Sequence, residues 1–119
     1  GYLSPSEIAR LYRVCDFFVF PSQFEIGPNV VLEAKACGSI CIVSPTGGGK
    51  RIYKPDYDGI IINKYDAKYW ADVIKDLISD KRKLSIMKKF ISKQQPESWS
   101  EIFNRDISPY WLKFLKNNK

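Results

Sequence analysis

Short apolar runs alternate with apolar stripes along the first 80 residues of the chain. Continuous apolar runs of three or four residues are typical of strands buried on both faces. Apolar residues at intervals of three and four are typical of helices that bury one face. The pattern therefore predicts an α/β fold, a parallel sheet with flanking helices. The predicted strands are Phe17–Phe20, Ile40–Val43 and Ile60–Ile62.

Helices are predicted before, between and after these strands. Ser4-Pro5-Ser6-Glu7 is a capping box with proline at the first helical position, and it opens a helix that runs to Cys15. The next helix is predicted over 28–37 and ends before Gly38. Later helices are predicted over 66–78, over 84–91, from the capping box at 98–101 with Ile102 and Phe103 inward, and beyond Ser108-Pro109 with Trp111, Leu112 and Leu115 inward.

Three strands are few for a doubly wound domain, because such a sheet keeps an uncovered apolar edge. The chain also starts at Gly1, and its only methionine is Met87. We therefore expect half of a domain cut from a longer protein, of marginal stability and prone to self-association. Within residues 1–119, the α/β part is expected over 1–80 and C-terminal helices over 81–119.

Composition excludes several kinds of function. Of the 119 residues, 45% are apolar, which is enough for a core, and no apolar run reaches the length of a membrane-spanning helix. Histidine is absent, which removes the usual general base and the commonest metal ligand. Cys15, Cys37 and Cys41 contain no C-x-x-C pair, so we interpret them as small core residues, reduced in a cytoplasmic protein.

The net charge of +6 belongs to the C-terminal third of the chain. Residues 1–80 carry nine basic and ten acidic side chains, whereas residues 81–119 carry ten and three. A basic segment with aromatic residues could dock peripherally on an anionic membrane or bind nucleic acid. We favour core packing beside a solvated lysine face, keep the membrane as the alternative and expect no nucleic acid. The aromatic residues assigned to inward stripes are Phe90, Trp99, Phe103, Trp111 and Phe114.

The loop after the first strand is the candidate binding site. Ligands of open α/β sheets bind outside the carboxyl ends of the strands, and the loop 22–29 leads into a helix N-terminus that favours an anion. Gly27 allows close approach of the backbone, and Glu25 and Glu33 flank the site. If Glu33 is buried, it needs donors such as the hydroxyls of a ribose; if it faces solvent, it gains only from the helix dipole.

These residues resemble a known enzyme family. Asp16–Ser22, Glu25–Glu33 and Ala34–Gly38 are similar to segments of the retaining nucleotide-sugar glycosyltransferases of the GT-B fold, in particular family 4, the glycosyl transferases group 1. The resemblance continues through 42–49 and 59–62 and reaches Ser98-Trp99, so that it covers about residues 4–103.

The resemblance implies a Rossmann-like domain, the C-terminal half of the donor-binding domain, in an enzyme that transfers a sugar with retention to an acceptor hydroxyl. Glu25 would be the catalytic residue near the donor sugar, and Glu33 would bind the ribose. No metal or other cofactor is expected, because protein charge and helix dipoles stabilise the leaving diphosphate. The other donor-binding residues would be Ile26, Gly27, Pro28, Asn29 and Val30.

The resemblance also implies partners beyond this segment. They are the nucleotide sugar, an acceptor-binding domain upstream of Gly1, and a lipid-linked acceptor of polysaccharide or glycolipid synthesis. The segment alone is expected to be inactive. Two alternatives stay open: a non-catalytic remnant that serves as an interaction module, and a sugar-nucleotide epimerase of the same fold.

Two short motifs allow two interpretations each. Lys50 and Arg51 either contact phosphate or are solvated, and Arg51 stands where the family often has an acidic residue. Asp56-Tyr57-Asp58 is a D-x-D sequence, which binds a metal in the other large glycosyltransferase fold. Here it precedes a strand within a Pro-Asp-x-Asp-Gly sequence, so we favour a turn without a metal.

Overall fold

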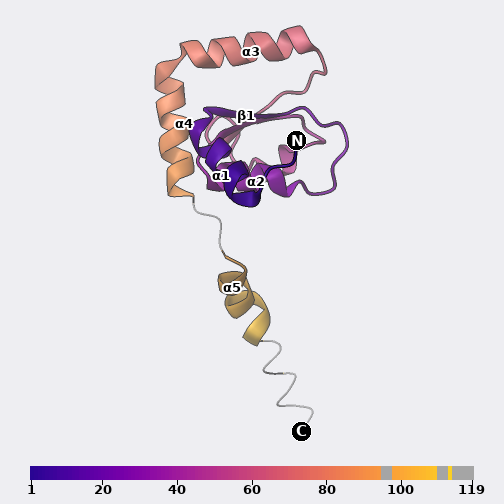
Figure 1. Ribbon diagram of the computed structural model, residues 1–119, viewed down its shortest axis with the longest axis vertical. Helices are drawn as coiled ribbons and strands as arrows, with labels where there is room; N and C mark the ends of the chain where they lie inside the picture. Colours follow the sequence, from indigo (N-terminus) through magenta and orange to yellow (C-terminus); the bar gives the residue numbers. More distant parts are fainter. Residues whose placement is uncertain (95–97, 110–112, 114–119) are drawn as a thin grey trace.

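The computed structural model describes residues 1–94, 98–109 and 113 (Figure 1). Three parallel strands form a sheet in the order β1-β2-β3, so the predicted parallel α/β fold is confirmed. The strands begin within one residue of their predicted starts. The elements are α1 (Pro5–Val14), β1 (Phe17–Phe20), α2 (Asn29–Ala36), β2 (Ile40–Val43), η1 (Gly49–Arg51), β3 (Gly59–Ile61), α3 (Ala67–Ser79), α4 (Lys81–Lys93), α5 (Trp99–Ile102) and η2 (Phe103–Ile107).

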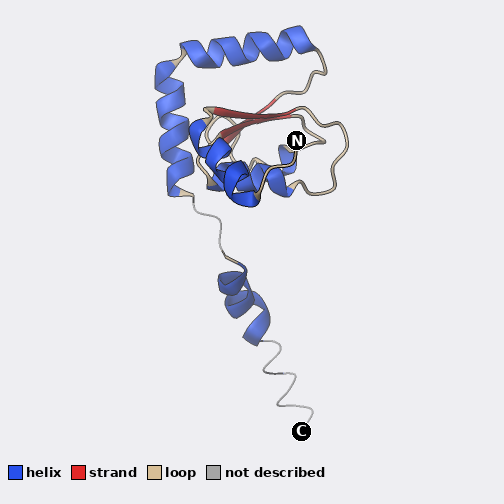
Figure 2. Ribbon diagram, viewed as in Figure 1, coloured by secondary structure: helices blue, strands red, loops and turns tan. Residues whose placement is uncertain are grey.

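The two faces of the sheet are covered by different helices (Figure 2). Successive residues of a strand point to opposite faces, so β2 contributes to both cores, and all four of its residues are buried. On one face, Ile40 and Ile42 pack with Trp70 and Leu77 of α3 and with Met87 of α4. The core of the other face consists of Val31, Ala34, Cys41, Val43 and Ile52.

Strand β1 departs from the prediction. It was expected to be buried on both faces, but its phenylalanines are only half-buried and Val19 is 42% exposed. Within the described sheet β1 is an edge strand, since it pairs with β2 alone, in a register that places Phe17 opposite Ile40. The apolar run therefore forms the predicted strand. Within the described residues, β1 is the apolar edge that was predicted to stay uncovered.

Helix α1 begins at the predicted capping box. The backbone N–H of Ser4 donates to the Glu7 carboxylate at 2.7 Å, and the Glu7 N–H donates to Ser4 Oγ at 3.4 Å. The Ser4 hydroxyl also donates to the Glu7 carboxylate, at 2.6 Å, and this bond, followed by the one from the Ser4 N–H, lowers the pKa of Glu7. The helix buries none of its residues completely, and Cys15 at its end is exposed. The prediction of a core position is therefore wrong for Cys15, whereas Cys37 is half-buried and Cys41 fully buried.

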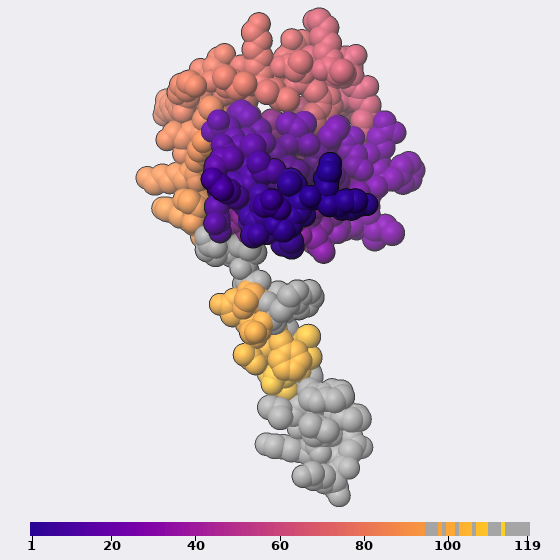
Figure 3. All heavy atoms as spheres, viewed as in Figure 1, coloured from indigo at the N-terminus to yellow at the C-terminus, as the bar shows by residue number. Residues whose placement is uncertain are grey.

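The C-terminal helices differ in their contact with the sheet. Helix α4 is tied to the α/β part by ion pairs of Lys88 with Asp16 and of Lys83 with Asp56. The second capping box is present, because the Ser98 N–H donates to the Glu101 carboxylate at 2.6 Å and the Glu101 N–H donates to Ser98 Oγ at 3.2 Å. Helix α5 nevertheless stands away from the sheet (Figures 1 and 3).

The inward stripe predicted for the last helix is not observed where it can be checked. Phe103 is 46% exposed, so that assignment is wrong; α5 and η2 stand apart from the sheet and do not extend its core. Phe90 is half-buried and packs against Tyr57, with ring centroids 5.6 Å apart. Trp111, Leu112, Phe114 and Leu115 lie outside the described residues, as do the side chains of Trp99 and Ile102.

Candidate functional site

The loops at the carboxyl edge of the sheet are fastened to one another. Ser44 follows β2, donates its N–H to Phe20 O at 3.2 Å and donates its hydroxyl to Ser22 O. Its Oγ also accepts from the Gly47 N–H at 3.0 Å. Ser44 thus joins the loop that follows β1 (residues 22–29, the first loop) to the turn that follows β2 and contains Gly47, Gly48 and Gly49 (the glycine turn). The two form one surface.

The glycine turn requires a residue without a side chain where it meets the first loop. A Cβ on Gly47 would lie 2.1 Å from Ser22 O, and a Cβ on Gly48 would lie 2.8 Å from the nearest carbon of Val43. A Cβ on Gly49 would have ordinary contacts, the nearest at 3.5 Å. The close contact between the two loops thus depends on Gly47, whereas Gly48 allows the turn to approach Val43 of β2.

The N-terminus of α2 opens onto this surface. Pro28 is its buried N-cap residue, and no side chain accepts a hydrogen bond from the first turn. The backbone N–H groups that begin a helix have no partner within the helix. Those of Asn29 and Val30 are therefore available to an anionic ligand, and the helix dipole favours a negative charge at the same place.

The two candidate carboxylates occupy different surroundings. Glu25 lies in the loop beside Ile26, and both side chains are exposed. Glu33 is exposed as well, one turn into α2, so it has no need of a ribose on grounds of burial, and a role in binding rests on its surroundings. It lines a groove of about 460 Å³ between α1 and α2, together with Pro5, Ile8, Ala9, Tyr12, Ala36 and Cys37.

Glu33 influences the ionisation of its neighbour in this groove. The pKa of the Tyr12 phenol is raised. Partial burial is the largest cause, and the negative charge of Glu33 is the second. The carboxylate thus lies within electrostatic reach of the Tyr12 hydroxyl. A groove with apolar walls and one carboxylate suits a ligand with a flat or apolar part and hydroxyl donors.

Arg51 joins the site, although it is separated from the first loop by more than 20 residues. Its Nη2 lies 3.0 Å from the position that a Cβ on Gly27 would occupy. Its Nε is buried and has no hydrogen-bond partner in the described part of the chain. The adjacent candidate, Lys50, is exposed on η1. A positive charge therefore lies against the loop that carries Glu25.

The D-x-D sequence forms a turn, as predicted. Asp58 is completely buried, whereas Asp56 is exposed and pairs with Lys83 of α4 at 2.6 Å. The two carboxylates therefore have separate protein partners. No group of three His, Cys, Asp or Glu residues in the described part could hold a metal ion.

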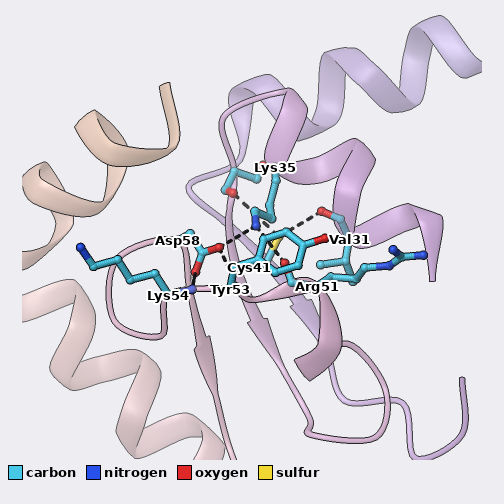
Figure 4. A network of polar contacts seen from close by, with 8 residues as sticks. Val31, Lys35, Cys41, Arg51, Tyr53, Lys54 and Asp58 are labelled. Atoms are coloured by element: carbon cyan, nitrogen blue, oxygen red, sulfur yellow. Dashed lines mark hydrogen bonds and ion pairs between the residues drawn. The ribbon is translucent and has the colours of Figure 1, made fainter. Parts of the chain in front are cut away.

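Sequence analysis missed the partner of Asp58. The Lys35 ammonium donates to Asp58 Oδ2 at 2.8 Å and also to Arg51 O at 2.8 Å (Figure 4). Lys35 follows the buried Val31 by four positions and therefore belongs to the inner face of α2. A lysine on the same face as the apolar Val31 and Ala34 was the available signal, since a buried ammonium needs an acceptor.

A family comparison shows which protein family this chain belongs to. The family model of the glycosyl transferases group 1 matches residues 1–94. The chain belongs to this family. This confirms the resemblance seen in the sequence, and it confirms that the chain is a GT-B glycosyltransferase domain.

Curated relatives of this glycosyltransferase domain carry several names. D-inositol 3-phosphate glycosyltransferase 1 of Catenulispora acidiphila is 29% identical over 87% of this chain and 25% of its own length. The N,N'-diacetylbacillosaminyl-diphospho-undecaprenol alpha-1,3-N-acetylgalactosaminyltransferase of Campylobacter jejuni is 39% identical over 65% of this chain and 20% of its own length. Spore coat protein SA of Bacillus subtilis is 32% identical over 92% of this chain and 30% of its own length.

A solved structure shares the fold of this glycosyltransferase domain. The crystal structure of Anabaena Alr3699/HepE in complex with UDP-glucose superposes with a TM-score of 0.66 over 76% of this chain, at 22% identity. This chain spans 25% of that one. The Rossmann-like fold predicted from the sequence is therefore confirmed. In the described part of the chain, no helix combines the length and the apolar character needed to cross a membrane.

Proposed function

We propose that this chain is the donor-binding part of a retaining glycosyltransferase. The observation that carries the proposal is the surface at the carboxyl edge of the sheet. There the uncapped N-terminus of α2 and the Arg51 guanidinium meet at Gly27. Backbone N–H groups and a fixed positive charge together suit the diphosphate of a nucleotide sugar. The UDP-glucose in the Anabaena structure supports the same class of ligand.

The residues predicted from the sequence take the following roles in this proposal. Glu33 accepts hydrogen bonds from the ribose hydroxyls in the groove between α1 and α2. Glu25, exposed in the loop, contacts the donor sugar and is the catalytic residue. Residues 26–30 offer their backbone to the sugar and the diphosphate, and Ile26 adds an exposed apolar side chain.

The chemistry follows from stabilising the leaving group. The bond between the anomeric carbon and the diphosphate oxygen breaks, a bond to the acceptor oxygen forms, and the proton of the acceptor hydroxyl passes to the departing diphosphate. Positioning of the donor and positive charge at the diphosphate lower the barrier. No metal or cofactor is part of the proposal. The acceptor, which we propose to be lipid-linked, binds to parts of the protein outside this segment, and the whole protein is cytoplasmic and peripheral to the membrane.

The experiment is an assay of the full natural protein with a panel of nucleoside-diphosphate sugars and a lipid-linked acceptor. We expect release of the nucleoside diphosphate that depends on the acceptor, and a product with the anomeric configuration of the donor. Glu25→Gln should lower kcat. An inverted product would contradict the retaining mechanism, and conversion of the nucleotide sugar without acceptor would favour the epimerase.

A non-catalytic interaction module is the second candidate. It is favoured by the likeness to spore coat protein SA, which covers 92% of this chain. In that case the full protein would bind neither the nucleotide sugars nor the nucleoside diphosphates of the panel.

A further inference from the structure

A buried ion pair lies against the segment that begins at Arg51 (Figure 4). It joins Lys35 of α2 to Asp58, which precedes β3, and the separation of the charged atoms is 2.8 Å. The side chain of Asp58 is completely buried and that of Lys35 is 10% exposed. The roles proposed above for the donor site do not involve either residue.

The pair holds one backbone segment through three hydrogen bonds to main-chain groups. Lys35 Nζ donates to Arg51 O at 2.8 Å. Asp58 accepts from the N–H groups of Tyr53 and Lys54 at 3.0 and 2.9 Å. With the ion pair itself, these bonds fix residues 51–54, the segment that leaves the glycine turn. The Lys35 ammonium also lies 5.0 Å from the centroid of the Tyr53 ring.

A pair of apolar side chains in place of Lys35 and Asp58 could not hold the backbone of residues 51–54. Removing two charges from water carries a desolvation penalty that their attraction often fails to recover. A hydrophobic pair of similar volume could fill the space, but Arg51 O and the N–H groups of Tyr53 and Lys54 would lose their partners. The ion pair therefore specifies a conformation of the segment 51–54, and it does so by reaching backbone groups.

The conformation that it specifies directs the Arg51 side chain. The carbonyl of Arg51 is held from inside by Lys35, and its guanidinium reaches the other way to Gly27, at the loop before α2. The buried Nε has no hydrogen-bond partner within the described residues. Buried donors in folded proteins are normally satisfied by protein, water or ligand, so an acceptor is expected at this guanidinium.

We propose that Arg51 binds the diphosphate of the donor, and that Lys35 and Asp58 are positioning residues that hold Arg51 against Gly27. The inference rests on the proposed function and deepens it by adding the two residues that position the positive charge at the diphosphate. An arginine at this place can offer two parallel N–H groups to phosphate oxygens. Such a ligand supplies positive charge where the leaving group departs.

The experiment separates phosphate recognition from binding of the nucleoside. Isothermal titration of the full natural protein is run with UDP, GDP, ADP and CDP, and the tightest of them is compared with its nucleoside. We expect Arg51→Met to weaken the diphosphate about tenfold to a hundredfold, as loss of a charge-assisted hydrogen bond does. Affinity for the nucleoside should not change. Lys75→Met, on the exposed side of α3, is the matched control and should leave both affinities unchanged.

A double-mutant cycle tests the positioning role. Lys35→Met should weaken the diphosphate severalfold when Arg51 is present and have no effect when Arg51 is already methionine. A purely structural role would weaken binding equally in both backgrounds, and that result would overturn the positioning. If Lys35→Met does not fold, Lys35→Gln, which retains an amide donor for Arg51 O, takes its place.

The outcomes distinguish the inference from the proposed function. If none of the four nucleoside diphosphates binds to the wild-type protein, the donor-binding function itself fails. If one binds and Arg51→Met binds it equally well, the function stands and the assignment of Arg51 is wrong.

Discussion

Asp58 and Asp56 lie two positions apart in one turn, yet their surroundings differ, and we expect them to contribute differently to the free energy of unfolding. Asp58 is buried and accepts hydrogen bonds from Lys35 and from two backbone N–H groups, whereas the side chain of Asp56 is 64% exposed and pairs with Lys83. Removing one partner of a buried ion pair leaves an uncompensated charge, while an exposed pair is screened by water. The same residue type in the same turn therefore has two physical roles.

The two aspartates give a matched pair of variants. Asp58→Asn should lower the free energy of unfolding by about 3 kcal/mol or more, because Lys35 remains buried without a counter-charge. Asp56→Asn should lower it by less than about 1 kcal/mol. The quantity to compare is the free energy from urea unfolding of the two variants. Equal losses would contradict the assignment of Asp58 as the buried anchor.

The cysteines differ in reactivity for a related reason. Burial raises the pKa of the Cys41 thiol to about 12, whereas Cys15 is exposed. At pH 8 a thiol reagent should modify Cys15 quickly and Cys41 only after unfolding, since the thiolate is the reactive form. Labelling of Cys41 at the rate of Cys15 in the folded protein would contradict this.

The same pKa predicts how stability changes in alkaline solution. The folded-state pKa lies above the ordinary thiol value of 9.0, so the unfolded chain loses this proton first as the pH rises. The contribution of Cys41 is therefore complete below pH 9.0 and declines between pH 9.0 and about 12. Urea unfolding across this range should show the decline, and Cys41→Val should remove that part of it.

At the scale of elements, capping boxes and apolar runs predicted helix and strand positions well, because these signals are local. The run of four apolar residues in β1 could not reveal its exposure, which depends on the strands beside it. The exposure of Phe103 depends likewise on how α5 sits relative to the sheet. The Lys35–Asp58 pair joins residues 23 positions apart, so it becomes visible only when α2 packs on the sheet and brings Lys35 to the turn before β3.

The candidate site shows the same division between local and long-range information. The loop 22–29 and the helix N-terminus could be located from the sequence, because a strand, a turn and a helix follow one another there. The place of Arg51 at Gly27 could not, since it depends on how the glycine turn packs against that loop. The exposure of Glu33 could not be predicted either, since it depends on how α1 packs beside α2 and leaves a groove there.

The contact between the glycine turn and the first loop makes a prediction at this scale. In Gly47→Ala the new Cβ would meet Ser22 O, a backbone atom, and the strain should lower the free energy of unfolding by about 1–3 kcal/mol. Gly49→Ala, two positions along the same turn, should change it by less than about 1 kcal/mol. Thermal or urea unfolding of both variants tests this, and equal stabilities would contradict the tight contact.

On the scale of the whole molecule, apolar surface remains open around a small sheet. Val19 of the edge strand lines a second groove of about 440 Å³ together with Pro21 and Trp70. An open edge strand is a template for pairing with another chain. The chain covers only 25% of the length of the Catenulispora relative. We therefore expect residues 1–119 by themselves to self-associate and to unfold at low denaturant concentration.

Sedimentation velocity over a range of concentrations tests this expectation. The predicted result is a sedimentation coefficient that increases with concentration. A monomer at every concentration, with a sharp cooperative melting transition, would show that the exposed edge and grooves need no cover.

The measurement that tests the donor site most directly is calorimetric binding of the preferred nucleoside diphosphate to the full natural protein and its Glu33→Gln variant. We expect the variant to bind about tenfold or more weakly, because the ribose loses a charged hydrogen-bond acceptor. Asp76→Asn, an exposed change on α3, is the control and should bind as the wild type does. Equal affinity of wild type and Glu33→Gln would contradict the proposed donor site in the groove between α1 and α2.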